Sequence, residues 1–139
     1  MKKRNRFRNY LSLEALVILL VIGSFKVIPD KRTASLFASF LFISSSLAIL
    51  YWETRTENFK KRASFWGALG FLVFSALPIL ALRLIYWEMP FEEIQMGPIT
   101  GADMHKYANY VFFLMMVCFF VDAQMERVKE KENLLNQQQ

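Results

Sequence analysis

The sequence is poor in the side chains from which most catalytic and metal sites are built, because its 139 residues include one cysteine and one histidine. The single cysteine, Cys118, excludes an intrachain disulfide, a thiol redox pair and a zinc site made of cysteines. One histidine excludes a bis-histidine haem site within the chain. A glycine-rich phosphate-binding loop, a nucleophile elbow and a His-Glu-x-x-His helix are also missing. We therefore predict no cofactor, and the sequence favours a protein that is not an enzyme.

Charged residues are absent from long stretches of the chain. They make up 21% of it and gather at the start, in the middle and after residue 121, whereas 55% of the residues are hydrophobic. A nucleic-acid-binding protein would instead carry its basic side chains along one folded surface. The segregation is typical of a membrane protein, so we expect the lipid bilayer, and not a nucleic acid, as its partner.

Four apolar runs are each long enough to cross a bilayer as a helix, which takes about 20 residues. They cover residues 11–28, 33–52, 64–87 and 104–121. None shows the alternation of a membrane β-barrel strand. The first run is too long for a cleaved signal peptide and lacks a small-residue cleavage site, so we expect it to be retained. The predicted fold is all-α, a single domain over residues 1–139 that forms a four-helix transmembrane bundle with a helical tail at 122–139.

The distribution of Lys and Arg predicts the orientation of these spans. Most of them fall on the side shared by the two termini and the connection between the second and third runs. These are Lys2, Lys3, Arg4, Arg6, Arg8, Arg55, Lys60, Lys61, Arg62, Arg127, Lys129 and Lys131. The opposite side has fewer, and its long connection is acidic. Both termini are therefore predicted to be cytoplasmic, and the lack of a eukaryotic sorting signal favours a bacterial cytoplasmic (inner) membrane.

Aromatic residues agree with this placement. The tripeptide Tyr-Trp-Glu ends the second run at 51–53 and the third run at 86–88, which puts it at opposite membrane faces. Tyrosine and tryptophan rings favour the headgroup region of a bilayer. Tyr10, Tyr107 and Tyr110 are expected to belong to the same aromatic belts.

Arg83 interrupts an apolar stretch near the end of the third run. An ionisable side chain within a span is costly and is a functional hypothesis by default. The simpler interpretation is that its long side chain extends to the nearby headgroups. The alternatives are that it faces the bundle and pairs with Glu88, Asp103 or Asp30, or that it binds an anionic group.

Glu14 lies about one turn into the first run, where a shallow, solvated carboxylate is the simpler interpretation and a transport element the alternative. Asn109, inside the fourth run, is expected to bond a neighbouring helix. Small residues around Ser35, Ser39 and Ser46, and the pair Ala63 and Gly67, predict close helix packing. Pro78 predicts a kink in the third helix.

The connection at 88–103 is the only segment outside the runs with local complexity. We expect a turn or two of helix after Pro90, with Phe91 and Ile94 against the membrane surface, a break at Gly97-Pro98, and Thr100 capping the fourth helix. The candidates for a metal or substrate are Glu92, Glu93, Asp103 and His105. Because they lack any fixed ligand spacing, no metal site is predicted.

The fourth helix is predicted to continue beyond the membrane. Val121, Met125, Val128 and Leu135 recur at coiled-coil spacing, with Glu132 at the missing position. Two heptads are too few for a coiled coil on their own. This segment is therefore either a solvated helical end or a docking site for a partner protein or a second copy.

Three functions remain open from the sequence. The first is a non-enzymatic subunit or accessory protein of a membrane complex, acting through helix faces and the tail. The second is a self-assembling channel or small transporter that uses Arg83 and Glu14. The third is a membrane enzyme with an acidic and histidine site in the connection at 88–103.

Overall fold

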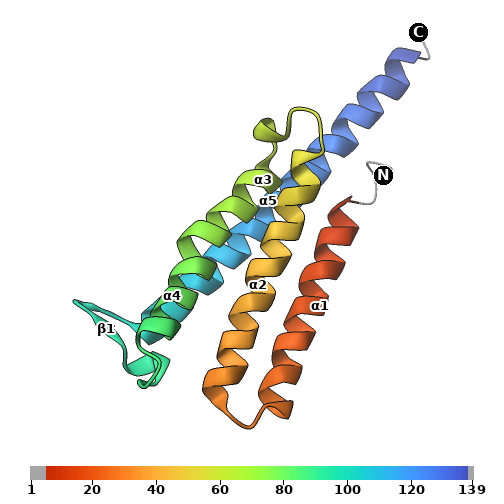
Figure 1. Ribbon diagram of the computed structural model, residues 1–139. Helices are drawn as coiled ribbons and strands as arrows, with labels where there is room; N and C mark the ends of the chain where they lie inside the picture. Colours follow the sequence, from red (N-terminus) through yellow and green to blue (C-terminus); the bar gives the residue numbers. More distant parts are fainter. Residues whose placement is uncertain (1–5, 138–139) are drawn as a thin grey trace.

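The computed structural model describes residues 6–137, and nearly all of them are helical (Figure 1). The main helices are α1 (Arg6–Val27), α2 (Lys31–Thr54), α3 (Ala63–Phe71), the π-helical turn η3 (Leu72–Ala76), α4 (Leu77–Ile85) and α5 (Gly101–Gln137). Shorter elements are the 3-10 turns η2 (Phe59–Lys61) and η4 (Phe91–Glu93) and the strands β1 (Gln95–Met96) and β2 (Ile99–Thr100). Of the sequence features above, Lys2, Lys3, Arg4 and the last two residues lie outside the described range.

Four helices are long and apolar enough to cross a membrane, which confirms the predicted spans in this form. They are Arg6–Val27, Lys31–Thr54, Ala63–Ile85 and Gly101–Gln137. Figure 1 shows them side by side, with the beginning of α1 and the end of α2 at one end of the bundle, where the C-terminal part of α5 also leaves it. We call this the terminal end. The opposite end carries the α1–α2 turn and the segment between α4 and α5, and we call it the loop end.

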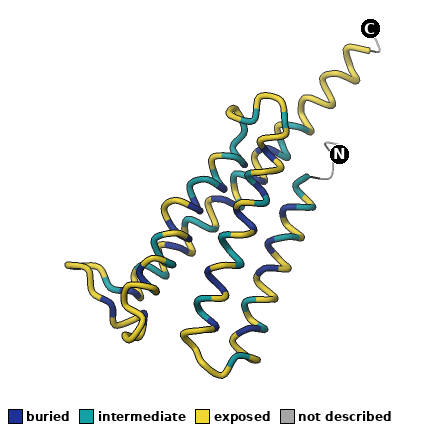
Figure 2. Tube along the Cα trace, in the orientation of Figure 1, coloured by how far each residue is buried: buried dark blue, intermediate teal, exposed yellow. Residues whose placement is uncertain are grey.

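The exposed surface of the bundle is that of a protein surrounded by lipid. Large apolar side chains on its outside remain open, such as Leu19 at 66%, Phe113 at 68% and Ile85 at 71% exposure. In Figure 2 the exposed and buried residues alternate along each helix, so that each helix buries only one stripe. A soluble monomer rarely exposes this much contiguous apolar surface, because water penalises it.

The core of the bundle is held by aromatic rings and by one close helix contact. Phe42, Phe71 and Phe112 form three mutual edge-to-face contacts, with ring centroids 5.5 to 5.9 Å apart. A Cβ built on Gly67 would lie 2.8 Å from the Cβ of Cys118, so α3 and α5 approach closely at this glycine. The small-residue contact expected at Gly67 is therefore present.

The α1–α2 turn is short because Asp30 starts the next helix at once. Its carboxylate accepts hydrogen bonds from the backbone N–H groups of Arg32 and Thr33 and from the Thr33 hydroxyl. This satisfies donors that the first turn of a helix leaves unpaired. The hydrogen bond from the Thr33 hydroxyl holds the pKa of Asp30 below its usual value, helped by the backbone N–H groups.

The third span contains a π-helical turn where the sequence predicts a kink. The turn occupies Leu72–Ala76, directly before Pro78. The proline ring would collide with the carbonyl four residues earlier in a regular α-helix. In the wider π-helical turn the N–H of Leu77 donates to the carbonyl of Leu72, five residues back, where a regular α-helix would bond four residues back.

The segment between α4 and α5 differs from the sequence expectation. Phe91 and Ile94 do not lie on the membrane surface; they are 7% and 1% exposed and pack on Leu82 of α4. The expected short helix after Pro90 is present as a single 3-10 turn, and a two-stranded hairpin that was not expected follows it, with its turn at Gly97 (φ 62°) where a break is predicted. Gly101 is required because a Cβ there would lie 1.7 Å from the carbonyl oxygen of Phe91. The segment therefore folds over the loop end as a cap.

Candidate functional site

Arg62, in the bend before α3, is the centre of an ion network at the terminal end. It lies 2.6 Å from a carboxylate oxygen of Glu53, 2.7 Å from Glu126 and 3.8 Å from Asp122. Burial by itself lowers the pKa of Arg62, but the hydrogen bond to Glu126 and the charges of Glu53 and Asp122 outweigh it and raise the pKa overall. Arg62 therefore stays a cation that connects α2 to α5.

Asp122 of α5 caps the first turn of α3. Its carboxylate accepts hydrogen bonds from the Ser64 backbone N–H at 2.7 Å, the Ser64 hydroxyl at 2.5 Å and the Ala63 N–H at 3.1 Å. A negative charge is favourable at a helix N-terminus. This role could not be predicted from the sequence, because a capping residue usually lies next to the helix it caps, whereas Asp122 belongs to another helix.

Tyr10 of α1 completes the network. Its hydroxyl donates to the Glu53 carboxylate at 2.6 Å, and its ring stacks on Trp52 with the planes 7° apart. Tyr10 is 2% exposed, so the expectation that it belongs to the interfacial belt is wrong. All four spanning helices thus meet in one polar cluster at the terminal end.

Glu14 lies one helical turn further into the bundle than Tyr10. It is 1% exposed, so the expected solvated position is wrong. Within the described part of the chain neither carboxylate oxygen has a hydrogen-bond partner. The hydroxyl of Ser45 lies beside the carboxylate but donates to the carbonyl of Phe42.

Arg83 and His105 lie together at the loop end. A terminal nitrogen of Arg83 is 3.3 Å from Nε2 of His105, and the guanidinium lies 4.5 Å from the centre of the Phe91 ring. The guanidinium Nε is buried and has no partner among the described residues. Arg83 therefore contacts Phe91 of the loop cap and His105 of α5.

The acidic residues considered as partners of Arg83 are used elsewhere. Glu88 pairs with Arg32 at 3.3 Å, and Asp103 accepts from the hydroxyl of Thr100 at 2.8 Å and lies 4.0 Å from Lys106. Asp30 caps α2. Over residues 6–137 Arg83 forms no ion pair, so the alternative that it pairs with Glu88, Asp103 or Asp30 is not observed.

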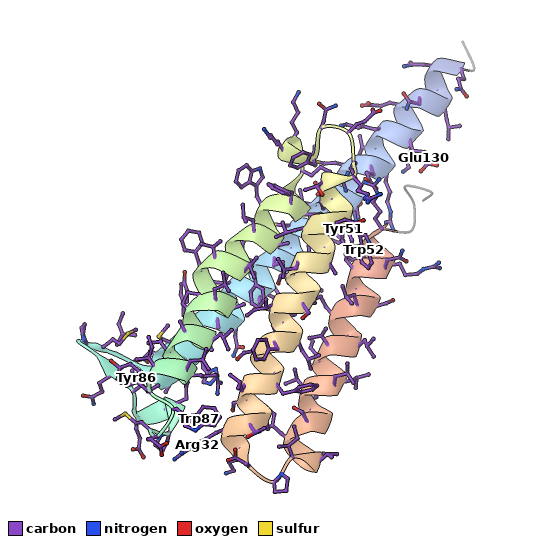
Figure 3. The ribbon with its side chains drawn as sticks, in the orientation of Figure 1. Arg32, Tyr51, Trp52, Tyr86, Trp87 and Glu130 are labelled. Carbon is purple, nitrogen blue, oxygen red and sulfur yellow. The ribbon has the colours of Figure 1, made fainter. Side chains whose placement is uncertain are left out.

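Two cavities adjoin Arg83. One, of about 560 Å³, opens between the α1–α2 turn and the loop cap, where Figure 3 shows Arg32 near Tyr86 and Trp87. The other, of about 310 Å³, continues between the helices and is mostly apolar. The residues that line both are Phe25, Ser35, Arg83 and His105. Asn109 lines the deeper cavity and, within the described chain, forms no hydrogen bond to another helix.

The acidic and histidine candidates are not assembled into a metal site. No group of three His, Cys, Asp or Glu side chains within residues 6–137 is placed to hold a metal ion. Glu92 and His105 line the same cavity, whereas Asp103 is bonded to Thr100 as part of the helix cap. The expected Thr100 cap of the fourth helix is thus present.

The end of α5 projects beyond the other helices at the terminal end, where Figure 3 places Glu130 on the free part (Figures 1 and 3). The four apolar residues of its predicted seam are exposed, Val121 at 40%, Met125 at 50%, Val128 at 55% and Leu135 at 62%. The network around Arg62 joins α5 to the bundle just before this projection begins.

The chain matches no protein-family model, and neither a curated protein nor a solved structure matches it.

Proposed function

We propose that this chain is a non-enzymatic subunit or accessory protein of a membrane complex, which binds a helix of a partner protein on the projecting part of α5. We place it in a bacterial cytoplasmic membrane with the terminal end in the cytoplasm, because the terminal end carries most of the Lys and Arg residues. The observation that carries the proposal is the exposed apolar seam on a helix that is anchored at its base.

The anchoring supports a docking role for the projection. Asp122 caps α3 and Glu126 pairs with Arg62, so two residues one turn apart on α5 are bound to the bundle. The exposed seam starts beside these two residues, at Val121 and Met125, and continues along the projecting part of the same helix, which ends at Gln137. A helix held in a fixed direction loses less conformational entropy on binding than a flexible tail does.

The residues along the seam favour a different protein over a second copy. Glu132 falls on the same face as Val128 and Leu135, in the position where the seam lacks an apolar residue. Two copies inserted in the same direction would pair their projections in parallel and place Glu132 opposite Glu132. Like charges at such a position destabilise a helix pair.

The residues of the seam also indicate which residues a partner helix should carry. A matching helix would carry apolar residues against Met125 and Val128 and a basic residue opposite Glu132. Lys129 and Lys131 flank the seam, so acidic residues beside the partner's own seam would complement them.

Site-specific photo-crosslinking in native membranes tests the proposal. A photo-reactive phenylalanine analogue in place of Val128 should crosslink to one different protein, whereas the same analogue at Glu130, on the opposite face, should not. The added substitution Glu132→Lys should abolish the crosslink from position 128. The matched control Glu130→Lys should leave it intact.

Two outcomes would overturn the proposal. The first is a crosslink from position 128 to a second copy of this chain, together with a defined homo-oligomer in native mass spectrometry, which would support the channel. The second is a crosslink that Glu132→Lys and Glu130→Lys affect equally, because the seam would then not select its partner.

A second candidate, a small transporter coupled to protons or cations, is favoured by one observation. The Glu14 carboxylate is enclosed in the bundle without a hydrogen bond from any described residue, and carboxylates in this position serve as ion or proton carriers in transporters. Proteoliposomes containing the purified chain would then show a proton flux that Glu14→Gln abolishes and that Glu57→Gln, at an exposed loop position, leaves unchanged. A wild-type flux equal to that of empty vesicles would eliminate this candidate.

A further inference from the structure

We propose that the two adjacent cavities at the loop end, which share Arg83 and His105 in their walls, bind a single-chain amphiphile with an anionic headgroup, a carboxylate or a phosphate. The headgroup would pair with Arg83, and the acyl chain would occupy the cavity between the helices. This site lies at the opposite end of the molecule from the projection of α5, and it does not depend on the function proposed above.

Arg83 carries a positive charge that no described residue pairs with. A guanidinium remains protonated under all ordinary conditions, and a half-buried cation such as Arg83 is costly when no counter-ion pairs with it. Arg83 has no ion pair within residues 6–137, and its Nε hydrogen has no acceptor there. Its one polar contact is to His105. An anion between the cap and the helices would supply the missing partner.

His105 is arranged to assist Arg83. A guanidinium only donates hydrogen bonds, so Nε2 of His105 must accept at their 3.3 Å contact. With Nε2 as the acceptor, a neutral ring carries its proton on Nδ1. The ring lines both cavities. His105 thus offers a second donor where the cavities meet.

The deeper of the two cavities, which Arg83 also lines, is suited to an acyl chain. The deeper cavity is lined by apolar side chains from all four spanning helices, including Val21, Ala38 and Ala76. Its volume of about 310 Å³ lies at the lower end of the range for ligand pockets, which begins near 300 Å³, so it suits one chain and not two.

Glu92 carries a charge of the same sign as the proposed headgroup. Its carboxylate lines the outer cavity and acts on the charge of Arg83, but it lies beyond ion-pair distance. It would repel an anionic headgroup. Removing this charge should therefore strengthen binding, while removing the charge of Arg83 should weaken it.

The test measures binding of defined amphiphiles to the full chain in nanodiscs of phosphatidylcholine, by calorimetry or native mass spectrometry. Laurate and dodecyl phosphate should bind, and dodecyltrimethylammonium, with the same chain and the opposite charge, should bind at least tenfold more weakly. Inorganic phosphate alone should also bind weakly, because it lacks the chain. Tight binding of inorganic phosphate would overturn the amphiphile and indicate a site for a free anion.

The variants distinguish the site from general adsorption. Arg83→Gln should reduce laurate affinity about tenfold or more, Glu92→Gln should increase it several-fold, and Lys26→Gln, a basic residue at the same end that lines neither cavity, should leave it unchanged. Ala38→Leu should fill the deeper cavity and reduce laurate affinity at unchanged thermal stability. If Arg83→Gln does not fold, Glu92→Gln and Ala38→Leu decide. Equal laurate affinity in wild type and in both of these variants would overturn the proposal.

Discussion

Ser64, in the first turn of α3, is capped by Asp122 of α5, which follows it by 58 residues in the chain. The carboxylate accepts from both the backbone N–H and the hydroxyl of Ser64. The start of one spanning helix is thus fixed by the middle of another. The same carboxylate lies within 3.8 Å of Arg62, so helix capping and ion pairing share one group.

Replacing Asp122 should therefore be costly. Asp122→Ala removes the cap of α3 and one counter-charge of the partly buried Arg62, and we expect a loss of about 3 kcal/mol in the free energy of unfolding. Asp122→Asn keeps one oxygen acceptor and should lose less. Unfolding of the full chain by sodium dodecyl sulfate in mixed micelles measures both. Asn133→Ala, on the projection, serves as the control, and equal stability of all three variants would contradict the capping role.

The hydrogen bond from Tyr10 to Glu53 should contribute measurably to stability. Tyr10→Phe leaves the stacked ring in place and removes one donor to a buried carboxylate, which should cost about 1.5–3 kcal/mol. Tyr110→Phe, at a ring that is 74% exposed, should cost almost nothing. A double-mutant cycle with Glu53→Gln isolates the interaction. A coupling energy near zero would show that the two side chains act independently.

The two glycines of α3 should respond in opposite directions to the same substitution. Gly67→Ala brings a Cβ within 2.8 Å of the Cys118 Cβ and should destabilise the bundle by about 1–3 kcal/mol. Gly70 has no atom within 4 Å of the new Cβ, so Gly70→Ala should be neutral or stabilising by up to about 1 kcal/mol. The added change Cys118→Gly should rescue Gly67→Ala, whereas Cys118→Ala should not, because the collision is with the Cβ.

The start of α2 should weaken in acid. The pKa of Asp30 is held low in the folded chain, mainly by the Thr33 hydroxyl, so its stabilising effect is complete above the unfolded pKa and is lost as the pH falls through the folded pKa. Hydrogen exchange at the backbone amide of Thr33, which donates to Asp30, should accelerate over that acidic range. Asp30→Asn should remove most of this pH dependence. An identical pH profile in the variant would mean that another group controls the turn.

Sequence patterns were sufficient for features that depend on neighbouring residues. The spans follow from apolar runs, the cap of α5 from Thr100 and Asp103, and the close contact of α3 from Gly67. Each of these is local, or needs only that a helix have some neighbour. The sequence alone could not show that the helix packed against Gly67 is α5.

The polar network could not be predicted, because its members come from separate segments. Tyr10, Glu53 and Asp122 each lie near the end of an apolar run, where tyrosines and carboxylates are ordinary at a membrane surface. Only the packing of the helices shows that they converge on Arg62. The burial of Phe91 and Ile94 was missed for a similar reason, since an apolar residue in a loop can contact lipid or protein equally well.

The uneven distribution of polar bonds has a mechanical consequence. At the terminal end, Tyr10, Glu53, Arg62 and Asp122 bind all four spanning helices to one another. At the loop end the α1–α2 hairpin is joined to the rest by the exposed pair of Arg32 and Glu88, across the outer cavity. The polar contacts therefore hold the four helices together strongly at the terminal end and weakly at the loop end. Among the described residues, a separation of the helices at the loop end would break the two exposed hydrogen bonds from Arg32 to Glu88 and some apolar packing, whereas a separation at the terminal end would break the whole buried polar network.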